Sequence, residues 1–203
     1  MPIVLIATTN PGKLREYRHL FESVPGVQVV SPNDIEVWVE VAETGDTFEE
    51  NALLKARALY NALPDEARAE RIWVLGDDSG LEVDALGGAP GVHSNRWAGP
   101  GTTAQQRNEA LLERLRDVLD AERTARFKCV VALINPSGEE TILEGAVEGA
   151  IAHEPKGDGG FGYDPLFVLA NGRRMSELSP DEKNLISHRG VAGSKAAEVV
   201  RNA

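Results

Sequence analysis

The sequence predicts an α/β protein with a mixed central β-sheet flanked by helices. In the first half of the chain, apolar runs typical of buried strands alternate with segments of helical spacing. In the second half, two long strand-like segments are separated by a tight turn. Strands that alternate with helices usually pair in parallel, whereas the two strands of a hairpin pair antiparallel. The length of 203 residues fits a single domain, 1–203, with room for two lobes.

The first third of the chain alternates between strand and helix patterns. Ile3–Ala7 is a continuous apolar run, Lys13–Phe21 has apolar residues at helical spacing, and Val27–Val30 is a second short apolar run. The next helix begins at a capping box formed by Thr47 and Glu50 and keeps one apolar face up to the following proline. We therefore expect a β-α-β unit followed by a well-capped helix.

The middle of the chain is expected to hold a strand, a long loop and a helix. Ile72–Leu75 is typical of a buried strand, and Gly87–Gly101 is rich in glycine and proline, as loops are. Thr103 with Gln106 caps a helix whose apolar side chains recur at helical spacing.

The last third is expected to hold a hairpin, a loop and two helices. The hairpin pairs Phe127–Ile134 with Thr141–Ala152 around an Asn-Pro-Ser-Gly turn, and a glycine-rich loop covers Lys156–Pro165. Ser179-Pro180-Asp181-Glu182 is a strong helix start, with a cap, a proline at the first position and an acid at the third. A final helix is expected over Ser194–Val200.

The composition is that of an acidic globular protein. Hydrophobic residues make up 42% and charged residues 26%, and 21 basic residues stand against 32 acidic ones, a net charge of −11. Such a chain repels nucleic-acid polymers, but a small phosphorylated substrate can still bind a local basic cluster with a divalent metal.

The longest apolar run, Cys129–Ile134, is far shorter than the roughly 20 residues of a membrane span. No basic segment precedes the first apolar run, so this run is expected to be a strand and not part of a signal peptide. The lone cysteine cannot form an internal disulfide, which fits a reducing, cytoplasmic setting.

A turn between the first strand and the first helix has the composition of a phosphate site. Thr8-Thr9-Asn10-Pro11-Gly12-Lys13 combines short hydroxyl and amide side chains, a glycine and a lysine at a helix N-terminus. An ordinary capped turn explains the same residues equally well. The segment is not a Walker A loop, because Ala7 stands where that motif needs glycine and Leu14 where it needs serine or threonine.

Two adjacent acids follow the strand Ile72–Leu75. The segment Gly76-Asp77-Asp78-Ser79-Gly80 is expected at the carboxyl end of that strand, where ligands of open α/β sheets collect. Carboxylates there can bind Mg²⁺ or act as a base on water, and the plainer alternative is an Asp-rich turn. Glu43, before the capped helix, is a candidate further metal ligand that spacing alone does not decide.

The C-terminal part offers a second group of candidate residues. Lys156–Pro165 packs four glycines around two aromatics and two acids, so its backbone can approach a ligand and an aromatic ring can stack on a base. The alternative is a surface loop with one anchoring aromatic. Lys183 and Ser187 share a helix face, and His188 and Arg189 can donate to carbonyl or phosphate oxygens or to the last carbonyls of a helix.

Together these segments resemble the inosine/xanthosine triphosphate pyrophosphatase family, nearly from end to end. Each motif alone is weak, whereas their joint presence in this order is highly specific. The motifs are Ala7-Thr8-Thr9-Asn10-Pro11-Gly12-Lys13, Glu43-Thr44-Gly45, Phe48-Glu49-Glu50-Asn51-Ala52, Asp77-Asp78-Ser79-Gly80-Leu81, Gly87-Gly88-Ala89-Pro90-Gly91, Gly159-Gly160-Phe161-Gly162-Tyr163-Asp164-Pro165 and Ser187-His188-Arg189-Gly190.

The resemblance implies a Mg²⁺-dependent hydrolase of nucleotide metabolism. Such an enzyme converts dITP, ITP and XTP to the monophosphate and pyrophosphate and so removes deaminated purines from the nucleotide pool. The resemblance also implies two lobes with the active-site cleft between them, a cytoplasmic homodimer, and a purine nucleoside triphosphate as partner, with no nucleic-acid polymer and no membrane.

The resemblance also implies a role for each matching residue. Asp78 would be the catalytic base and a metal ligand, with Glu43 as the second metal ligand, and Ser79 would touch the substrate. The triphosphate would be held by Thr8, Thr9, Asn10, Pro11, Gly12 and Lys13. The base and sugar would be bound by Phe161, Gly162, Tyr163, Asp164, Lys183, His188 and Arg189.

The chain departs from the family pattern at three positions. Ala42 replaces an acid that some members place before Glu43, so metal binding would rest on fewer carboxylates. His93 and Asn95 differ from the aromatic and small residues usual in that segment, while Arg96 matches.

Two other functions fit part of the pattern. A phosphomonoesterase of the haloacid-dehalogenase type would use Asp77 or Asp78 as nucleophile and release orthophosphate, but it would want a second aspartate where this chain has Ser79. A regulatory nucleotide-binding module without turnover would have little use for paired acids beside the phosphates.

Overall fold

The computed structural model describes residues 2–37, 39–64, 67 and 72–203, which form two compact units. Unit 1 comprises Met1–Asp78, Cys129–Gly145 and Arg189–Ala203, and unit 2 comprises Ser79–Lys128 and Ala146–His188. Three strands contribute residues to both units. Within the described residues no helix is long and apolar enough to cross a membrane.

The strands form one six-stranded sheet in the order β2-β1-β3-β4-β5-β6. Strand β1 is parallel to both β2 and β3, whereas β5 and β6 are antiparallel, so the predicted mixed sheet is confirmed. The strands are β1 (Ile3–Ala7), β2 (Gln28–Val30), β3 (Ile72–Val83), β4 (Thr124–Ile134), β5 (Glu140–Ile151) and β6 (Phe167–Val168).

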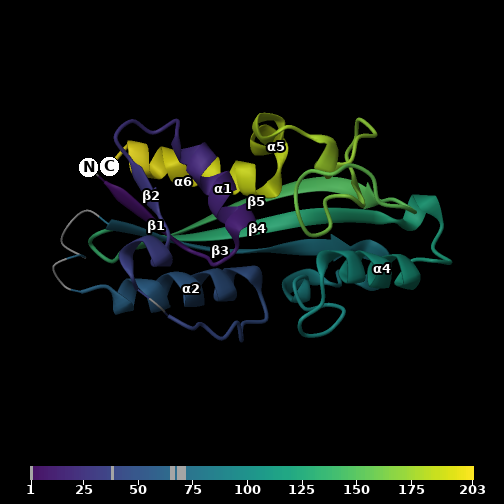
Figure 1. Ribbon diagram of the computed structural model, residues 1–203, viewed down its shortest axis with the longest axis horizontal. Helices are drawn as coiled ribbons and strands as arrows, with labels where there is room; N and C mark the ends of the chain where they lie inside the picture. Colours follow the sequence, from purple (N-terminus) through teal and green to yellow (C-terminus); the bar gives the residue numbers. More distant parts are fainter. Residues whose placement is uncertain (1, 38, 65–66, 68–71) are drawn as a thin grey trace. The chain divides into compact units, whose positions relative to one another are not determined.

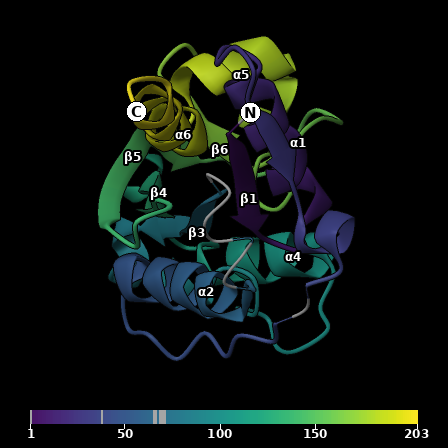
Figure 2. The same ribbon diagram turned by 90° about the vertical axis from the view of Figure 1, so that its left-hand side faces the viewer.

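In unit 1, helices cover both faces of the strands. Helices α1 (Pro11–Phe21) and α6 (His188–Arg201) lie on one face and α2 (Phe48–Ala62) on the other (Figures 1 and 2). The predicted capping box of α2 is present, with Thr47 as N-cap and Glu50 at the third position. Gly76 of β3 lies so close to the backbone of α2 that a Cβ there would collide with it. This close approach brings the side chains of α2 near the middle of β3.

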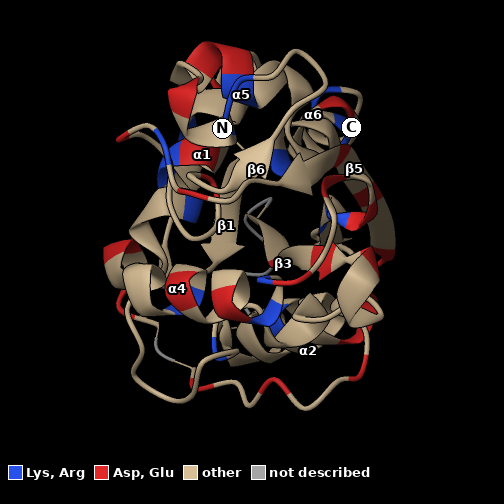
Figure 3. Cartoon of the chain, turned by 90° about the vertical axis from the view of Figure 1, so that its right-hand side faces the viewer, with Lys and Arg blue, Asp and Glu red and all other residues tan. Residues whose placement is uncertain are grey.

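Unit 2 has its own apolar core. Helix α4 (Ala104–Arg114) is capped by Thr103 and Gln106 as predicted, and α5 (Pro180–Ile186) by Ser179 and Glu182. The core joins side chains of β3, β4, β5 and α4 to the loop before β6. Acidic and basic positions are interspersed along α4, whereas α2 of unit 1 has its acids in the first turn and its basic residues further along the helix (Figure 3).

The two largest departures from the predicted bounds are at β3 and α6. Strand β3 does not stop at Leu75 but continues through the two acids to Val83, so the predicted strand end and the alternative of an Asp-rich turn are both wrong. Aspartate and glycine are poor strand formers, and only tertiary contacts explain their place in the strand. Helix α6 begins at His188 and not near Ser194. Its glycines interrupt the apolar pattern, but a Cβ at Gly193 would lie 2.6 Å from Leu20 Cδ1, so the glycine permits close packing on α1.

Candidate active site

The predicted phosphate turn is a capped helix start. Asn10 is the N-cap of α1, and its Oδ1 accepts hydrogen bonds from the main-chain N–H of Gly12 at 2.8 Å and of Lys13 at 3.2 Å. Thr8 Oγ1 accepts from the N–H of Asn10 at 3.1 Å, and Pro11 occupies the first turn. The amide of Asn10 therefore acts as a cap, and the exposed Thr9 is the side chain of this turn that remains for a ligand, because the Lys13 ammonium pairs with Asp77.

The two acids of β3 have different surroundings. Adjacent residues of a strand point to opposite faces of the sheet, so Asp77 points toward α1 and α6, whose Tyr17 and Arg189 it contacts, while Asp78 points toward α2. This alternation within one strand separates two carboxyl groups that the sequence analysis treated as a pair.

Asp77 is buried and fully engaged by donors of unit 1. Its Oδ2 accepts from Arg189 Nε at 2.8 Å, from the Tyr17 hydroxyl at 2.7 Å and from Cys129 Sγ at 3.3 Å. Its Oδ1 pairs with the ammonium of Lys13. Burial alone would raise the pKa of Asp77, but Arg189 and Lys13 hold it well below its usual value. The lowered pKa keeps Asp77 ionised at neutral pH, where it anchors Arg189 and Lys13.

Arg189 completes this buried network from the first turn of α6. Its Nη1 donates to Glu16 at 2.7 Å, so the guanidinium lies against two carboxylates within unit 1. Burial disfavours its charge, but Asp77 and Glu16 raise the pKa of Arg189 well above its usual value. In these contacts Arg189 neutralises Asp77. They do not support the expectation that Arg189 binds the purine base of a nucleotide.

Asp78 is less strongly neutralised than Asp77. Its Oδ1 lies 2.7 Å from Lys55 Nζ, and Asn51 Nδ2 lies 3.4 Å from its Oδ2. Burial raises the pKa of Asp78, Lys55 offsets part of this shift, and Glu43 adds to it, so that the pKa lies above its usual value. A carboxylate with a raised pKa is better able to accept a proton.

Lys55 connects Asp78 to Glu43. Its Nζ lies 2.7 Å from Oε1 of Glu43 and 2.7 Å from Oδ1 of Asp78. Asn51 fixes the Glu43 segment beside α2, since its side chain bonds both the N–H of Gly45 at 2.9 Å and the carbonyl of Gly45 at 3.2 Å. The two carboxylates predicted as metal ligands therefore converge on one cationic group.

Lys55 belongs to this site although it is not among the residues predicted from the sequence. A signal was present, because Asn51 and Lys55 are four residues apart in a well-capped helix and so share a face. What could not be inferred was which strand that face contacts, since this depends on the close approach of α2 to Gly76.

The C-terminal candidates of unit 2 form a second cluster. Asp164 is buried and accepts from the N–H of Phe161 at 2.8 Å and from Lys183 Nζ at 2.7 Å. The Lys183 ammonium also lies 4.7 Å from the centre of the Phe161 ring, a cation–π contact. Gly160 has a φ of +72°, and a Cβ there would collide with the Asp164 carboxylate, which explains the glycine.

Two further predicted residues lie in buried surroundings of unit 2. The Tyr163 hydroxyl donates to the carbonyl of Ser94 at 2.9 Å, and burial raises the pKa of Tyr163 to about 12. The His188 ring stacks on Phe127, with ring centres 4.8 Å apart and planes 14° apart. Gly162 has a φ of +62°, in the region that favours glycine, and Ser79 is half-buried on β3.

Tyr17→Phe is expected to lower the free energy of unfolding by about 1.5–3 kcal/mol, because it removes a buried hydrogen bond to a charged acceptor. Tyr163→Phe is the matched control, since it removes a hydrogen bond from another buried tyrosine to a neutral carbonyl and should cost only about 0.5–1.5 kcal/mol. Urea unfolding of the two variants measures both values. A Tyr17→Phe loss no larger than that of Tyr163→Phe would contradict the assignment of Asp77 as an ionised acceptor.

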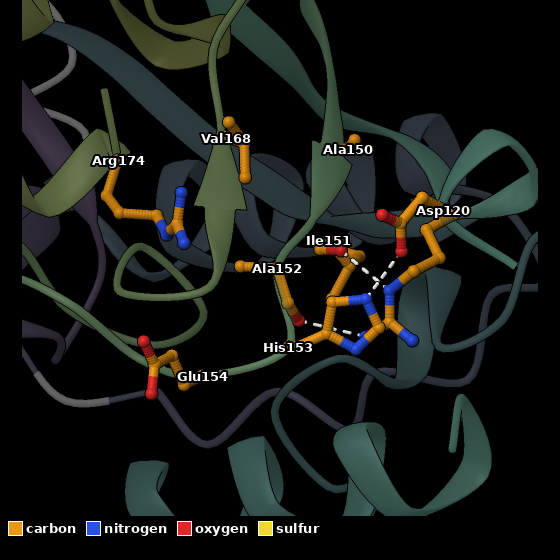
Figure 4. Close-up of a pocket in the computed structure, with 9 residues that line it drawn as sticks. Asp120, Ala150, Ile151, Ala152, His153, Glu154, Val168 and Arg174 are labelled. Atoms are coloured by element: carbon orange, nitrogen blue, oxygen red, sulfur yellow. Dashed lines mark hydrogen bonds and ion pairs between the residues drawn. The ribbon is translucent and has the colours of Figure 1, made fainter. Parts of the chain in front are cut away.

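A separate pocket of about 390 Å³ in unit 2 contains none of the predicted site residues. Figure 4 shows Asp120 paired with His153 on one side and Arg174 on the other. The buried Arg123 donates to three main-chain carbonyls around it, those of Leu115, Ile151 and Ala152. Arg123 therefore ties three segments of unit 2 together.

The comparisons with known proteins place the chain in a family. The model of the Ham1 family matches residues 4–199, which include every predicted site residue. The chain belongs to the Ham1 family. It is 47% identical over 197 residues to a dITP/XTP pyrophosphatase of Symbiobacterium thermophilum, covering 96% of this chain and 93% of the relative. It is 44% identical over 201 residues to a dITP/XTP pyrophosphatase of Bacillus subtilis, covering 98% of each.

Solved structures of the Ham1 family share the fold. The structure of a HAM1 protein from Coxiella burnetii matches with a TM-score of 0.86 and 39% identity, and the match covers both chains completely. The α/β class and the family resemblance predicted from the sequence are therefore confirmed.

Proposed function

We propose that this Ham1-family chain hydrolyses the non-standard purine nucleoside triphosphates dITP, ITP and XTP to the monophosphate and pyrophosphate. Relatives that are 44% and 47% identical over nearly the whole chain are named dITP/XTP pyrophosphatases. The observation that carries the proposal is the carboxylate of Asp78, which has a raised pKa and lies beside Lys55 and Glu43. The activity would remove deaminated purines from the nucleotide pool.

Asp78 is the proposed general base. Hydrolysis of the anhydride between the α- and β-phosphates needs an activated water and neutralisation of charge on the phosphate oxygens. Asp78 accepts the proton of the water in this proposal, while Lys13 and Lys55 bind phosphate oxygens. Asp77 supports the reaction indirectly, since it holds the Lys13 ammonium at the start of α1.

Glu43 and Asp78 suit a magnesium ion. Mg²⁺ is commonly held by one or two carboxylates together with substrate phosphates, and two carboxylate oxygens here converge on one cation, the Lys55 ammonium. Among the described residues no group of three or more acids, histidines or cysteines is arranged to hold a metal. Bound Mg²⁺ would neutralise charge on the phosphates.

The base and sugar are assigned to the cluster of unit 2. Phe161 offers an aromatic face beside the Lys183 ammonium, and His188 carries ring nitrogens that can donate to a carbonyl oxygen. Tyr163 and Asp164 would then support the loop that carries Phe161. A role of Arg189 at the base remains a prediction. The chain is further proposed to act as a cytoplasmic homodimer that binds neither a nucleic-acid polymer nor a membrane.

A panel of triphosphates tests the proposal. With Mg²⁺ present, we expect dITP, ITP and XTP to release pyrophosphate, and ATP to react far more slowly. A colorimetric phosphate assay should therefore give a signal only when inorganic pyrophosphatase is added to convert the pyrophosphate to orthophosphate. EDTA should abolish the activity. Orthophosphate released directly, with the nucleoside diphosphate as the other product, would contradict the proposal and favour a phosphomonoesterase-like reaction.

A further inference from the structure

We propose that the ammonium of Lys55 occupies the position of the divalent cation between Glu43 and Asp78, and that cation binding displaces it. This inference rests on the magnesium site of the proposed function and adds a competitor to it. It assigns Lys55 two successive positions, one in the metal-free protein and one in the metal-bound protein.

The geometry supports the exchange. Lys55 Nζ lies 2.7 Å from Oε1 of Glu43, 2.7 Å from Oδ1 of Asp78 and 3.1 Å from the carbonyl oxygen of Asp77. The ammonium therefore has three oxygen neighbours, which are the hard ligands that Mg²⁺ also prefers. A metal ion held by Glu43 and Asp78 would need the place that Nζ occupies.

The charges make simultaneous occupancy unfavourable. The Lys55 side chain is 12% exposed and that of Asp78 is 8% exposed, so solvent screens this pair poorly, whereas Glu43 is 34% exposed. Two carboxylates and one ammonium carry a net charge of −1, and the ammonium neutralises part of the attraction that a dication would otherwise feel. The metal-free protein is thus stabilised by an internal cation that lowers its affinity for an external one.

Lys55 is able to move, whereas the other lysine of unit 1 near these acids is anchored. Lys13 pairs with the carboxylate of Asp77, which points away from Asp78. Lys55 ends a flexible four-carbon stem on α2, and Asn51 continues to hold the Glu43 segment through Gly45 when Lys55 leaves. The displaced ammonium is then available for the oxygens of a phosphate, so the metal would bind before Lys55 takes up its role toward the substrate.

Metal binding without nucleotide tests the proposal. We expect Lys55→Met to bind Mn²⁺, measured by electron paramagnetic resonance, or Mg²⁺, measured by calorimetry, at least about tenfold more tightly than the wild type, because a neighbouring like charge is removed. Lys55→Arg keeps the charge and should bind as weakly as the wild type. Lys195→Met is the control for removal of a lysine elsewhere in unit 1, because its ammonium bonds the exposed carbonyl of Glu144, and it should leave affinity unchanged.

The outcomes separate this inference from the proposed function. Equal or weaker metal binding by Lys55→Met would overturn the displacement, even if Glu43→Gln abolishes binding and the triphosphate assay succeeds. Metal binding that survives Glu43→Gln would overturn it as well, since the site would lie elsewhere. Should Lys55→Met unfold more easily, the rise of its melting temperature with added Mg²⁺ gives the affinity, and a rise no greater than that of Lys55→Arg would contradict the proposal.

Discussion

Asp78→Asn is expected to lower turnover of dITP at least about 10²-fold, the scale of losing a general base. The amide keeps the shape of the side chain but cannot accept the proton of water, and it also weakens the attraction for a cation beside Glu43. The fold should persist, because Lys55 still has Glu43 as a partner and the raised pKa shows that the folded state favours a neutral group at Asp78. Initial rates of pyrophosphate release measure the effect.

Asp117→Asn, at an exposed position of unit 2, is the control for loss of a negative charge and should retain wild-type turnover. Circular dichroism on both variants checks that the fold is retained. Turnover of Asp78→Asn within a few-fold of the wild type would contradict the assignment and leave the activation of water to another group.

Asp77→Asn is expected to lower the free energy of unfolding by about 3–5 kcal/mol, the range measured when one partner of a buried ion pair is removed. The substitution leaves the Arg189 guanidinium buried with Glu16 as its remaining anionic partner, and it frees the Lys13 ammonium. Turnover should fall too, since Lys13 loses its anchor. Urea unfolding at neutral pH gives the loss of stability directly.

The pH dependence of this loss follows from the lowered pKa of Asp77. A carboxyl whose pKa is lower in the folded than in the unfolded protein stabilises the fold above the unfolded value of about 3.9, and this contribution disappears as the pH falls through the folded value. The difference in stability between wild type and Asp77→Asn should therefore be constant near neutral pH and shrink only in acid. The difference would instead shrink near neutral pH if Asp77 were protonated there.

Asp84→Asn provides the matched control for loss of an aspartate paired with an arginine. The Asp84 carboxylate accepts hydrogen bonds from both terminal nitrogens of Arg126, at 2.9 and 3.0 Å, but this ion pair is exposed to solvent. Its loss of stability should be much smaller than that of Asp77→Asn, because exposed ion pairs contribute little. Equal losses would contradict the view that burial makes Asp77 the anchor of unit 1.

Local signals predicted most of the helices. The capping boxes at Thr47, Thr103 and Ser179 all lie at helix starts as expected. A capping box acts over four residues, so the sequence contains all of its chemistry. The order of alternating elements likewise predicted a mixed sheet, because parallel and antiparallel connections differ in length.

The roles of Asp77 and Asp78 could not be predicted in the same way. Their adjacency suggested one paired site, whereas the extended backbone of β3 turns them to opposite faces of the sheet. The strand continues through them because cations from distant segments neutralise each acid, Arg189 and Lys13 for one and Lys55 for the other. Such partners are 23 to 112 residues away in the sequence, and no local pattern identifies them.

The most direct test of this division between two adjacent acids is a titration of both carboxyl carbons by nuclear magnetic resonance on protein labelled with ¹³C at aspartate Cγ. The signals are assigned with Asp77→Asn and Asp78→Asn. We predict that Asp78 titrates above the usual value of about 3.9, while Asp77 stays ionised down to the pH at which the protein unfolds. Protonation of Asp77 at a higher pH than Asp78 would contradict the account, because the anchoring and the proton-accepting carboxylate would then be exchanged.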